Sequence, residues 1–231
     1  MSFHPFRTLA ALALLACLTL TGCAHVQPPV ALDHQFWDNK EQTIGVAITA
    51  VPQPVLALTG NQGLLDLAIN TSVNSTLRGN VEKWQVNDLN TLPDAIVARL
   101  KAKGYKAKRI NEPVNLTAYK EASFREGYNP RDLSSLKATY GVDRLLLINV
   151  LATGATRSYY SFVPTSAPMA QVGGQGMVVD LTDNKLLWFK PFVVVQAAQG
   201  EWDEPNYANL TNAFYQAMDT SRQQMITPFE Q

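Results

Sequence analysis

The sequence contains very little cysteine. Of its 231 residues only Cys17 and Cys23 are cysteines, and both lie near the N-terminus. The rest of the chain therefore has no residue with which to form an internal disulfide, a thiol nucleophile or a cysteine-ligated metal site. We expect its fold to be held together by the hydrophobic core alone.

Histidine is almost as scarce. The three histidines are His4, His25 and His34, so none follows residue 34. This distribution argues against Ser–His or Cys–His catalysis and against a histidine-rich zinc site in the body of the chain. We expect His25 and His34 to be solvated linker residues. The sequence thus predicts no catalytic residue, no metal site and no cofactor, which indicates a protein that is not an enzyme.

An excess of charge of either sign is also missing. The chain has 19 basic and 19 acidic residues and a formal net charge of zero. Proteins that bind nucleic acid electrostatically carry an excess of basic residues on one face. We therefore expect no nucleic acid among the partners of this chain.

What the N-terminus does contain is a short apolar run. Arg7 is the only fixed cation before it, residues 9–20 carry no charge, and the run ends in Leu20-Thr21-Gly22-Cys23. About a dozen residues are too few to span a bilayer, which takes about 20. A positive start, a short apolar core and a small residue before a cleavage site are typical of a secretory signal. The alternative is a buried N-terminal helix.

Leu20-Thr21-Gly22-Cys23 resembles the lipobox of bacterial lipoprotein signal peptides. The resemblance implies that Cys23 is acylated and becomes the first residue of the mature chain. Two or more acyl chains anchor a protein stably, because each buried methylene contributes about 0.8 kcal/mol. Ala24, the residue after the cysteine, implies sorting to the outer membrane rather than retention in the inner membrane. We expect the body of the chain to face the periplasm.

The lipobox divides the chain into three parts. Residues 1–22 are the predicted lipoprotein signal peptide, and residues 23–35 are the lipidated cysteine and a tether. Residues 36–231 form a single predicted α/β domain. Removing the signal leaves 231 − 22 = 209 residues, which is ample for one domain with a real core.

Hydrophobic periodicity predicts the elements of this domain. The predicted strands are 43–50, 105–110, 144–151, 169–181 and 186–198, and the predicted helices are 64–78, 87–103, 129–141 and 207–226. The run Leu145-Leu146-Leu147-Ile148 is typical of a central strand buried on both faces. The last two strands are joined at a turn, residues 182–185, and so form an antiparallel hairpin. The expected fold is α/β (α+β), a single mixed sheet of about five strands with helices packed on it.

The segment 51–84 is longer than a simple α/β unit requires. Gly60 and Gly63 mark a loop in it, and Leu65, Ile69, Val73 and Leu77, with Ala68, then lie on one face of the predicted helix 64–78. This apolar face either packs on the sheet or contacts a partner subunit or a membrane surface. Leu65, Ile69 and Val73 are therefore our candidate partner contacts.

Glycines gather at Gly173-Gly174-Gln175-Gly176, within a predicted strand. A phosphate-binding loop needs a strand-to-helix turn and usually a nearby cation, and this segment offers neither. We expect these glycines to mark a bulge or a close approach of two backbones.

Carboxylates gather in two places. Glu201, Asp203 and Glu204 share one loop, where they either bind calcium or are solvated ahead of the last helix. Asp180 and Asp183 flank the hairpin turn and are expected to serve it. They could act as an acid and base pair only if a cleft lay beside them.

Two segments of the domain carry a further resemblance. Residues 140–147, Tyr-Gly-Val-Asp-Arg-Leu-Leu-Leu, and the hairpin 179–188 resemble periplasmic lipoproteins of the anticodon-binding-domain-like fold, of the curli-secretion and Pel-export type. The similarity covers residues 43–226 and implies a fold, not functional residues. From the sequence as a whole we expect a lipid-anchored envelope protein with a non-enzymatic scaffold, assembly or accessory role, with a protein partner or self-association. A small-ligand-binding module and a carboxylate-based hydrolase are the alternatives.

Overall fold

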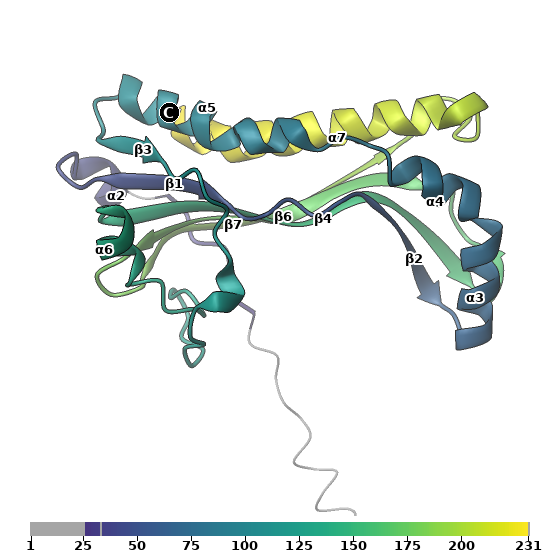
Figure 1. Cartoon of the computed structure of the whole chain (residues 1–231), viewed down its shortest axis with the longest axis horizontal. Coiled ribbons are helices and arrows are strands. Elements are labelled where there is room, and N and C mark those ends of the chain that lie inside the picture. Colours follow the sequence, from purple (N-terminus) through teal and green to yellow (C-terminus); the bar gives the residue numbers. More distant parts are fainter. Residues whose placement is uncertain (1–25, 33, 231) are drawn as a thin grey trace, which may run out of the picture.

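The strand β4 (Arg144–Tyr160) is the axis of a seven-stranded mixed sheet (Figure 1). This computed structural model describes residues 26–32 and 34–230. The first part of β4 pairs in parallel with β1 (Ile44–Ile48), and β1 pairs in parallel with β3 (Ala107–Arg109). Cys23 and the predicted signal peptide lie outside the described residues.

The remaining strands extend the sheet along and beside β4. The last part of β4 pairs in parallel with β2 (Val55–Asn61) and, at its end, antiparallel with β5 (Val163–Pro164). The opposite edge of β4 pairs antiparallel with β6 (Met169–Asp180), which pairs antiparallel with β7 (Leu186–Ala197). The predicted mixed sheet with a C-terminal antiparallel hairpin is therefore confirmed.

Helices cover the sheet unevenly. The α-helices are α2 (His34–Asp38), α3 (Leu64–Val73), α4 (Ser75–Val81), α5 (Leu92–Ala102), α6 (Leu136–Tyr140) and α7 (Ala208–Ile226). Four short 3-10 helices are η1 (Asn87–Thr91), η2 (Leu116–Ala118), η3 (Pro205–Tyr207) and η4 (Thr227–Phe229). α5 and α7 lie side by side on one face, and α6 lies across the sheet from them (Figure 1). None of the helices within the described ranges is long and apolar enough to cross a membrane.

The first part of β4 is buried on both faces. Leu146 and Ile148 belong to the core under α5 and α7, whereas Leu145 and Leu147 belong to a second core that includes Leu136 of α6. Side chains alternate between the two faces of a strand, so a strand that passes between two cores has consecutive apolar residues there, as at Leu145–Ile148. The prediction of a central strand is confirmed.

The sequence predicted a strand that ends at residue 151, whereas β4 continues to Tyr160. The register against β6 shifts between Val150 and Ala152, and Leu151, which lies at this bulge, is 63% exposed. Gly154 follows with φ +125°, and a Cβ there would lie 2.1 Å from the carbonyl oxygen of Val55. Only glycine fits this backbone conformation beside β2. Beyond the bulge the strand curves away from the long helices (Figure 1).

The segment 51–84 differs from its prediction in two ways. The expected loop around Gly60 is largely the strand β2, which finds its partner in the unpredicted part of β4. The expected helix 64–78 is two helices, α3 and α4, because the backbone of Asn74 leaves the helical region at φ −96° and ψ 12°. Neither the pairing nor the break follows from local periodicity.

The glycine-rich segment of β6 has the role expected of it. A Cβ on Gly174 would lie 2.3 Å from the carbonyl oxygen of Asn149, and a Cβ on Gly176 would lie 2.4 Å from the Trp188 ring. These glycines allow close approach of the neighbouring strand and of a core tryptophan. The bulge itself lies on β4, opposite them.

The described part of the expected tether lies against the body. The backbones of Val30 and Phe189 form two hydrogen bonds, with N–H to O=C distances of 2.8 and 2.9 Å. Farther upstream, the Gly127 N–H donates to the Gln27 side-chain oxygen at 2.8 Å. The chain is thus held on the body from Gln27 onward.

We predict that Leu146→Ala lowers the free energy of unfolding by about 2–5 kcal/mol, because it leaves a cavity in the core. Leu151→Ala is the matched control on the same strand, and an exposed site should change stability by no more than about 0.5 kcal/mol. Chemical denaturation of a chain that starts at residue 24 measures both values. Equal shifts for the two variants would contradict the two-core description of β4.

Candidate functional site

The helix α3 carries its apolar residues on the outside. The predicted contact residues Leu65, Ile69 and Val73 are 75%, 43% and 71% exposed, and Leu64 and Leu67 are exposed as well. The only buried residue of α3 is Asn70. The alternative that this face packs on the sheet is therefore wrong for α3, whereas Leu77 of the same predicted face, on α4, is buried in the core. We call Leu64, Leu65, Leu67, Ile69 and Val73 the α3 surface.

Polar side chains attach α3 to the sheet. The Asn70 amide donates to the side-chain oxygen of Gln62 at 2.7 Å and to the Ser161 carbonyl oxygen at 2.9 Å. The Asn74 amide donates to the Tyr159 hydroxyl at 2.7 Å and accepts from the Arg157 guanidinium at 2.9 Å. The inner side of α3 is therefore held by hydrogen bonds where an amphipathic helix ordinarily uses apolar contacts.

The spacing of the polar residues explains this orientation. Asp66, Asn70 and Asn74 are four residues apart, so they form one stripe along the helix. Asp66 accepts from the Gly63 N–H at 3.0 Å and caps the first turn, while the two asparagines face the sheet. The prediction followed the apolar stripe and overlooked this polar one, which is equally visible in the sequence.

A loop beside α3 adds to the exposed apolar area. Tyr160, Phe162 and Val163 lie where β4 turns back into β5, and all three are exposed. The hydrogen bond from Asn70 to the Ser161 carbonyl ties this turn to α3. Residues 55–77 contain one charged side chain, Asp66, and residues 158–169 contain none. This end of the molecule is apolar and almost without charge.

Part of the sheet also has an open apolar face. Val193 and Val195 of β7 are exposed, whereas the alternating Phe192 and Val194 are buried in the core under α7. Val55 of β2 pairs with Gly154 of β4, and Gly154 pairs with the residue of β6 that pairs with Val195. Residues paired across neighbouring strands point to the same face of a sheet, so the exposed Val55 lies on the same face as Val195. In Figure 1 the helices α5 and α7 run along the opposite face. We call Val55, Val193 and Val195 the open sheet face.

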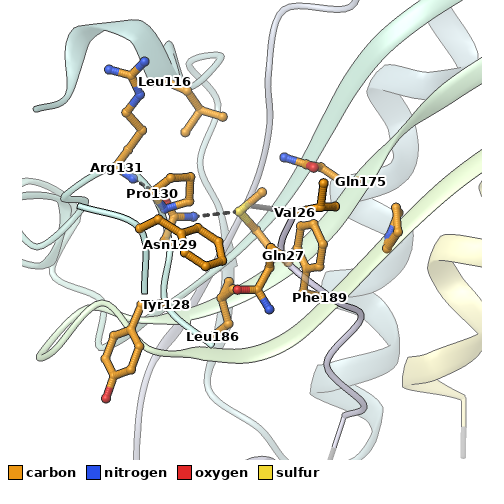
Figure 2. A pocket seen from close by; sticks show the side chains of 13 residues that line it. Val26, Gln27, Leu116, Tyr128, Asn129, Pro130, Arg131, Gln175, Leu186 and Phe189 are labelled. Atoms are coloured by element: carbon orange, nitrogen blue, oxygen red, sulfur yellow. Dashed lines mark hydrogen bonds between the residues drawn. The ribbon is translucent and has the colours of Figure 1, made fainter. Parts of the chain in front are cut away.

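A cavity of about 330 Å³ lies where the open sheet face meets the second core. Its apolar lining includes Leu116, Met177, Leu186 and Phe189, and Figure 2 shows their labelled members around one space. Val26, the first described residue, also lines the cavity. The cavity was not predicted, since separate segments of the chain assemble it.

Two polar groups of the cavity wall, on Asn129 and Arg131, are engaged by other groups of the protein. The Asn129 amide donates to the Met177 sulfur at 3.0 Å. The Arg131 guanidinium donates to Glu121 at 2.7 Å and to the Tyr119 carbonyl at 3.2 Å. The cavity therefore suits an apolar ligand better than a charged one.

The carboxylates that were candidates for a catalytic or calcium site either bond to the hairpin turn or are exposed to solvent. Asp180 accepts from the Thr182 N–H at 2.9 Å, and Asp183 accepts from the Lys185 N–H at 3.0 Å, so both serve the hairpin turn. Glu201, Asp203 and Glu204 are exposed. Within residues 26–32 and 34–230 no group of three or more acidic, histidine or cysteine side chains is placed to hold a metal ion.

We predict that Asn74→Ala destabilises the chain by about 1–3 kcal/mol, because it removes the partner of the Tyr159 hydroxyl and of Arg157. Exposed Asn61→Ala is the control for loss of an asparagine. Chemical denaturation gives the free energies of unfolding. In Asn74→Ala the amide hydrogen-exchange rates should increase more in α3 than in the other elements. An Asn74→Ala variant as stable as Asn61→Ala would show that the polar attachment is dispensable.

Comparison with known proteins finds distant structural similarity only. No family model and no curated protein matches the chain. A PelC dodecamer variant from Paraburkholderia phytofirmans aligns over 90% of this chain and 96% of its own, at 8% identity and a TM-score of 0.30. Lipoprotein GNA1162 from Neisseria meningitidis aligns over 79% and 99%, at 14% identity and a TM-score of 0.30. Protein XCC0632 from Xanthomonas campestris aligns over 80% and 90%, at 13% identity and a TM-score of 0.34. Similarity at this level assigns no function to the chain.

Proposed function

We propose that this chain is a lipid-anchored protein of the bacterial envelope with a non-enzymatic scaffold or assembly role, and that it acts by self-association through the α3 surface. The observation that carries the proposal is the orientation of α3. Its five large apolar residues are exposed, and its one buried residue is polar. Contiguous apolar patches on a folded protein mark interaction sites.

The composition of this end of the molecule favours a protein partner over a lipid surface. Helices that lie on membranes carry Lys and Arg on their polar face, and α3 has neither. The cores of protein interfaces are instead depleted of charge and enriched in aromatic residues. The α3 surface, with Tyr160 and Phe162 beside it, has that composition.

The open sheet face supports a second copy of this chain as the partner. A sheet face in a folded domain is ordinarily covered by another layer, and the open sheet face lacks one. The helix α3 of a neighbouring copy would supply that layer. Without residues 1–22 the chain loses only Arg7, so 19 − 1 = 18 basic residues face 19 acidic ones, and the net charge of −1 gives little long-range repulsion between copies. Such a contact joins two different surfaces, so it generates a closed ring or an open filament.

The anchor in this proposal is Cys23. Its support is the sequence Leu20-Thr21-Gly22-Cys23 after a short apolar run. Acyl chains on this residue hold the chain in the outer membrane with its body in the periplasm. The division into a signal peptide 1–22, an anchor region 23–35 and a domain 36–231 belongs to the same proposal.

A small-ligand-binding module is the second candidate, and the apolar cavity favours it. Ligand pockets in proteins measure about 300–1,000 Å³, and this cavity of about 330 Å³ falls at the lower end. A hydrolase has less support, because the hairpin carboxylates Asp180 and Asp183 are engaged in turn hydrogen bonds.

Cys23→Ser should abolish lipidation, because a hydroxyl does not replace the thiol as the acceptor of a diacylglyceryl group. Metabolic labelling with palmitate and inhibition of processing by globomycin measure this. Cys17→Ser, within the predicted signal peptide, is the matched control and should be labelled normally. Equal labelling of the Cys23→Ser variant would reject the anchor.

Leu65→Glu and Ile69→Glu together should dissociate the assembly without unfolding the monomer, since both side chains are exposed and a carboxylate is costly only in the buried interface. Analytical ultracentrifugation of the detergent-solubilised protein measures the mass, and circular dichroism and thermal melting report folding. Ala98→Glu, at an exposed position of α5, is the matched control.

Two outcomes would contradict self-association through α3. One is a wild-type protein that is monomeric at every concentration. The other is a double variant that keeps its wild-type mass. Unfolding of the double variant would instead show that these residues are part of the core, against their exposure in the structure.

A further inference from the structure

The cavity that Val26 lines is close to the point where the proposed lipid is attached. Cys23 precedes Val26 by three residues, and three extended residues span at most about 11 Å. Gln27 and Val30 are hydrogen-bonded to the body, so the chain is fixed at this end of the described residues. An acyl chain on Cys23 would therefore start within about 11 Å of Val26, a residue of the cavity lining.

The cavity has the chemistry that an acyl chain requires. Leu116, Leu186 and Phe189 supply apolar contacts, and the Met177 side chain can adapt to an irregular ligand. The lining amide of Asn129 and guanidinium of Arg131 have partners within the protein, so a polar head group is not needed to satisfy them. Such a space shields the methylenes of a chain that has left the bilayer from water.

The volume restricts the occupant further. About 330 Å³ is enough for part of one acyl chain, and a lipoprotein cysteine carries several. The other chains would remain in the bilayer. Figure 2 shows Val26 beside Gln175 and Phe189 in the cavity lining, so the first described residue is part of the cavity wall.

We propose that this cavity is an acyl-chain site, and that its occupant is one of the acyl chains on Cys23 of the same molecule. The inference rests on the proposed lipidation of Cys23. It gives the cavity a role independent of self-association: one chain is sheltered by the protein, and the body is held close to the membrane surface.

The test is photo-crosslinking in intact cells. Cells expressing the full chain are fed a palmitate analogue that carries a diazirine near its methyl end, irradiated, and the purified protein is digested and analysed by mass spectrometry. We expect crosslinks from the Cys23 lipid to peptides that contain Leu116, Met177 or Phe189. Crosslinks confined to phospholipid or to the α3 surface would overturn the proposal.

Gln175→Trp fills the cavity and should reduce these crosslinks at least fivefold. Gln171→Trp is the matched control, because it lies four residues earlier on the same strand and the same sheet face but outside the cavity lining. Pro191→Trp, from the β7 side of the lining, repeats the test if Gln175→Trp does not fold. Equal crosslinking in the filled and control variants would also overturn the proposal.

The outcomes separate this inference from the proposed anchor. If no analogue is incorporated at Cys23, the proposed lipidation itself fails. If the analogue is incorporated but does not reach the cavity, only the acyl-chain site fails. A Cys23→Ser protein that captures the free analogue in the cavity, while the lipidated protein does not, would identify a site for free fatty acids and reject the lipid of Cys23 as the occupant.

Discussion

The structure depends on one strand that passes through two different environments. Up to Val150, β4 lies between two apolar cores, and every side chain is buried. Beyond the bulge at Leu151, Ala155 and Tyr159 are still buried on one face, and the other face is open. A sheet that continues past its second core must either end or find another cover for that face. Here the sheet continues, and the α3 surface and the open sheet face both lie beside the part of β4 beyond Leu151.

The helix α3 shows how this extension is kept in place. An apolar side chain cannot both fill the core beneath a helix and remain available to a partner on its outside. In α3 the asparagines Asn70 and Asn74 make the inward contacts, which leaves the leucines outside. A hydrogen bond contributes only about 0.5–1.5 kcal/mol net, so this attachment is weaker than burial of several leucines would be. A second subunit that buried the α3 surface would restore the missing apolar contribution.

Apolar runs and apolar stripes in the sequence predicted the elements whose residues are close together in the chain. The run Leu145–Ile148, the two strands of the C-terminal hairpin and the stripes of α5 and α7 are visible in the sequence, and all are confirmed. The strand β2 was missed because its partner lies about 100 residues away, in a part of β4 whose polar and aromatic residues do not resemble a central strand. Periodicity reports which residues share a face, not what lies opposite that face.

The same limitation applies to the candidate site. Leu65, Ile69 and Val73 were identified as one stripe, but only the positions of Asn70 and Asn74 decide that the stripe faces outward. The cavity could not be identified at all, because it forms where Val26, Leu116 and residues of β6 and β7 meet.

The open sheet face and the cavity also constrain how the molecule can lie on a membrane. Both are on the side of the sheet opposite α5 and α7, and the described chain begins there, at Val26. An anchor three residues before Val26 would therefore turn this side toward the bilayer and the long helices away from it. The open sheet face, covered by the α3 of a neighbouring copy, would then lie on the membrane side of the assembly. The anchor would therefore promote the assembly. Attachment in one orientation places all copies in the same plane, and this raises the effective concentration at which the α3 surface of one copy meets the open sheet face of another.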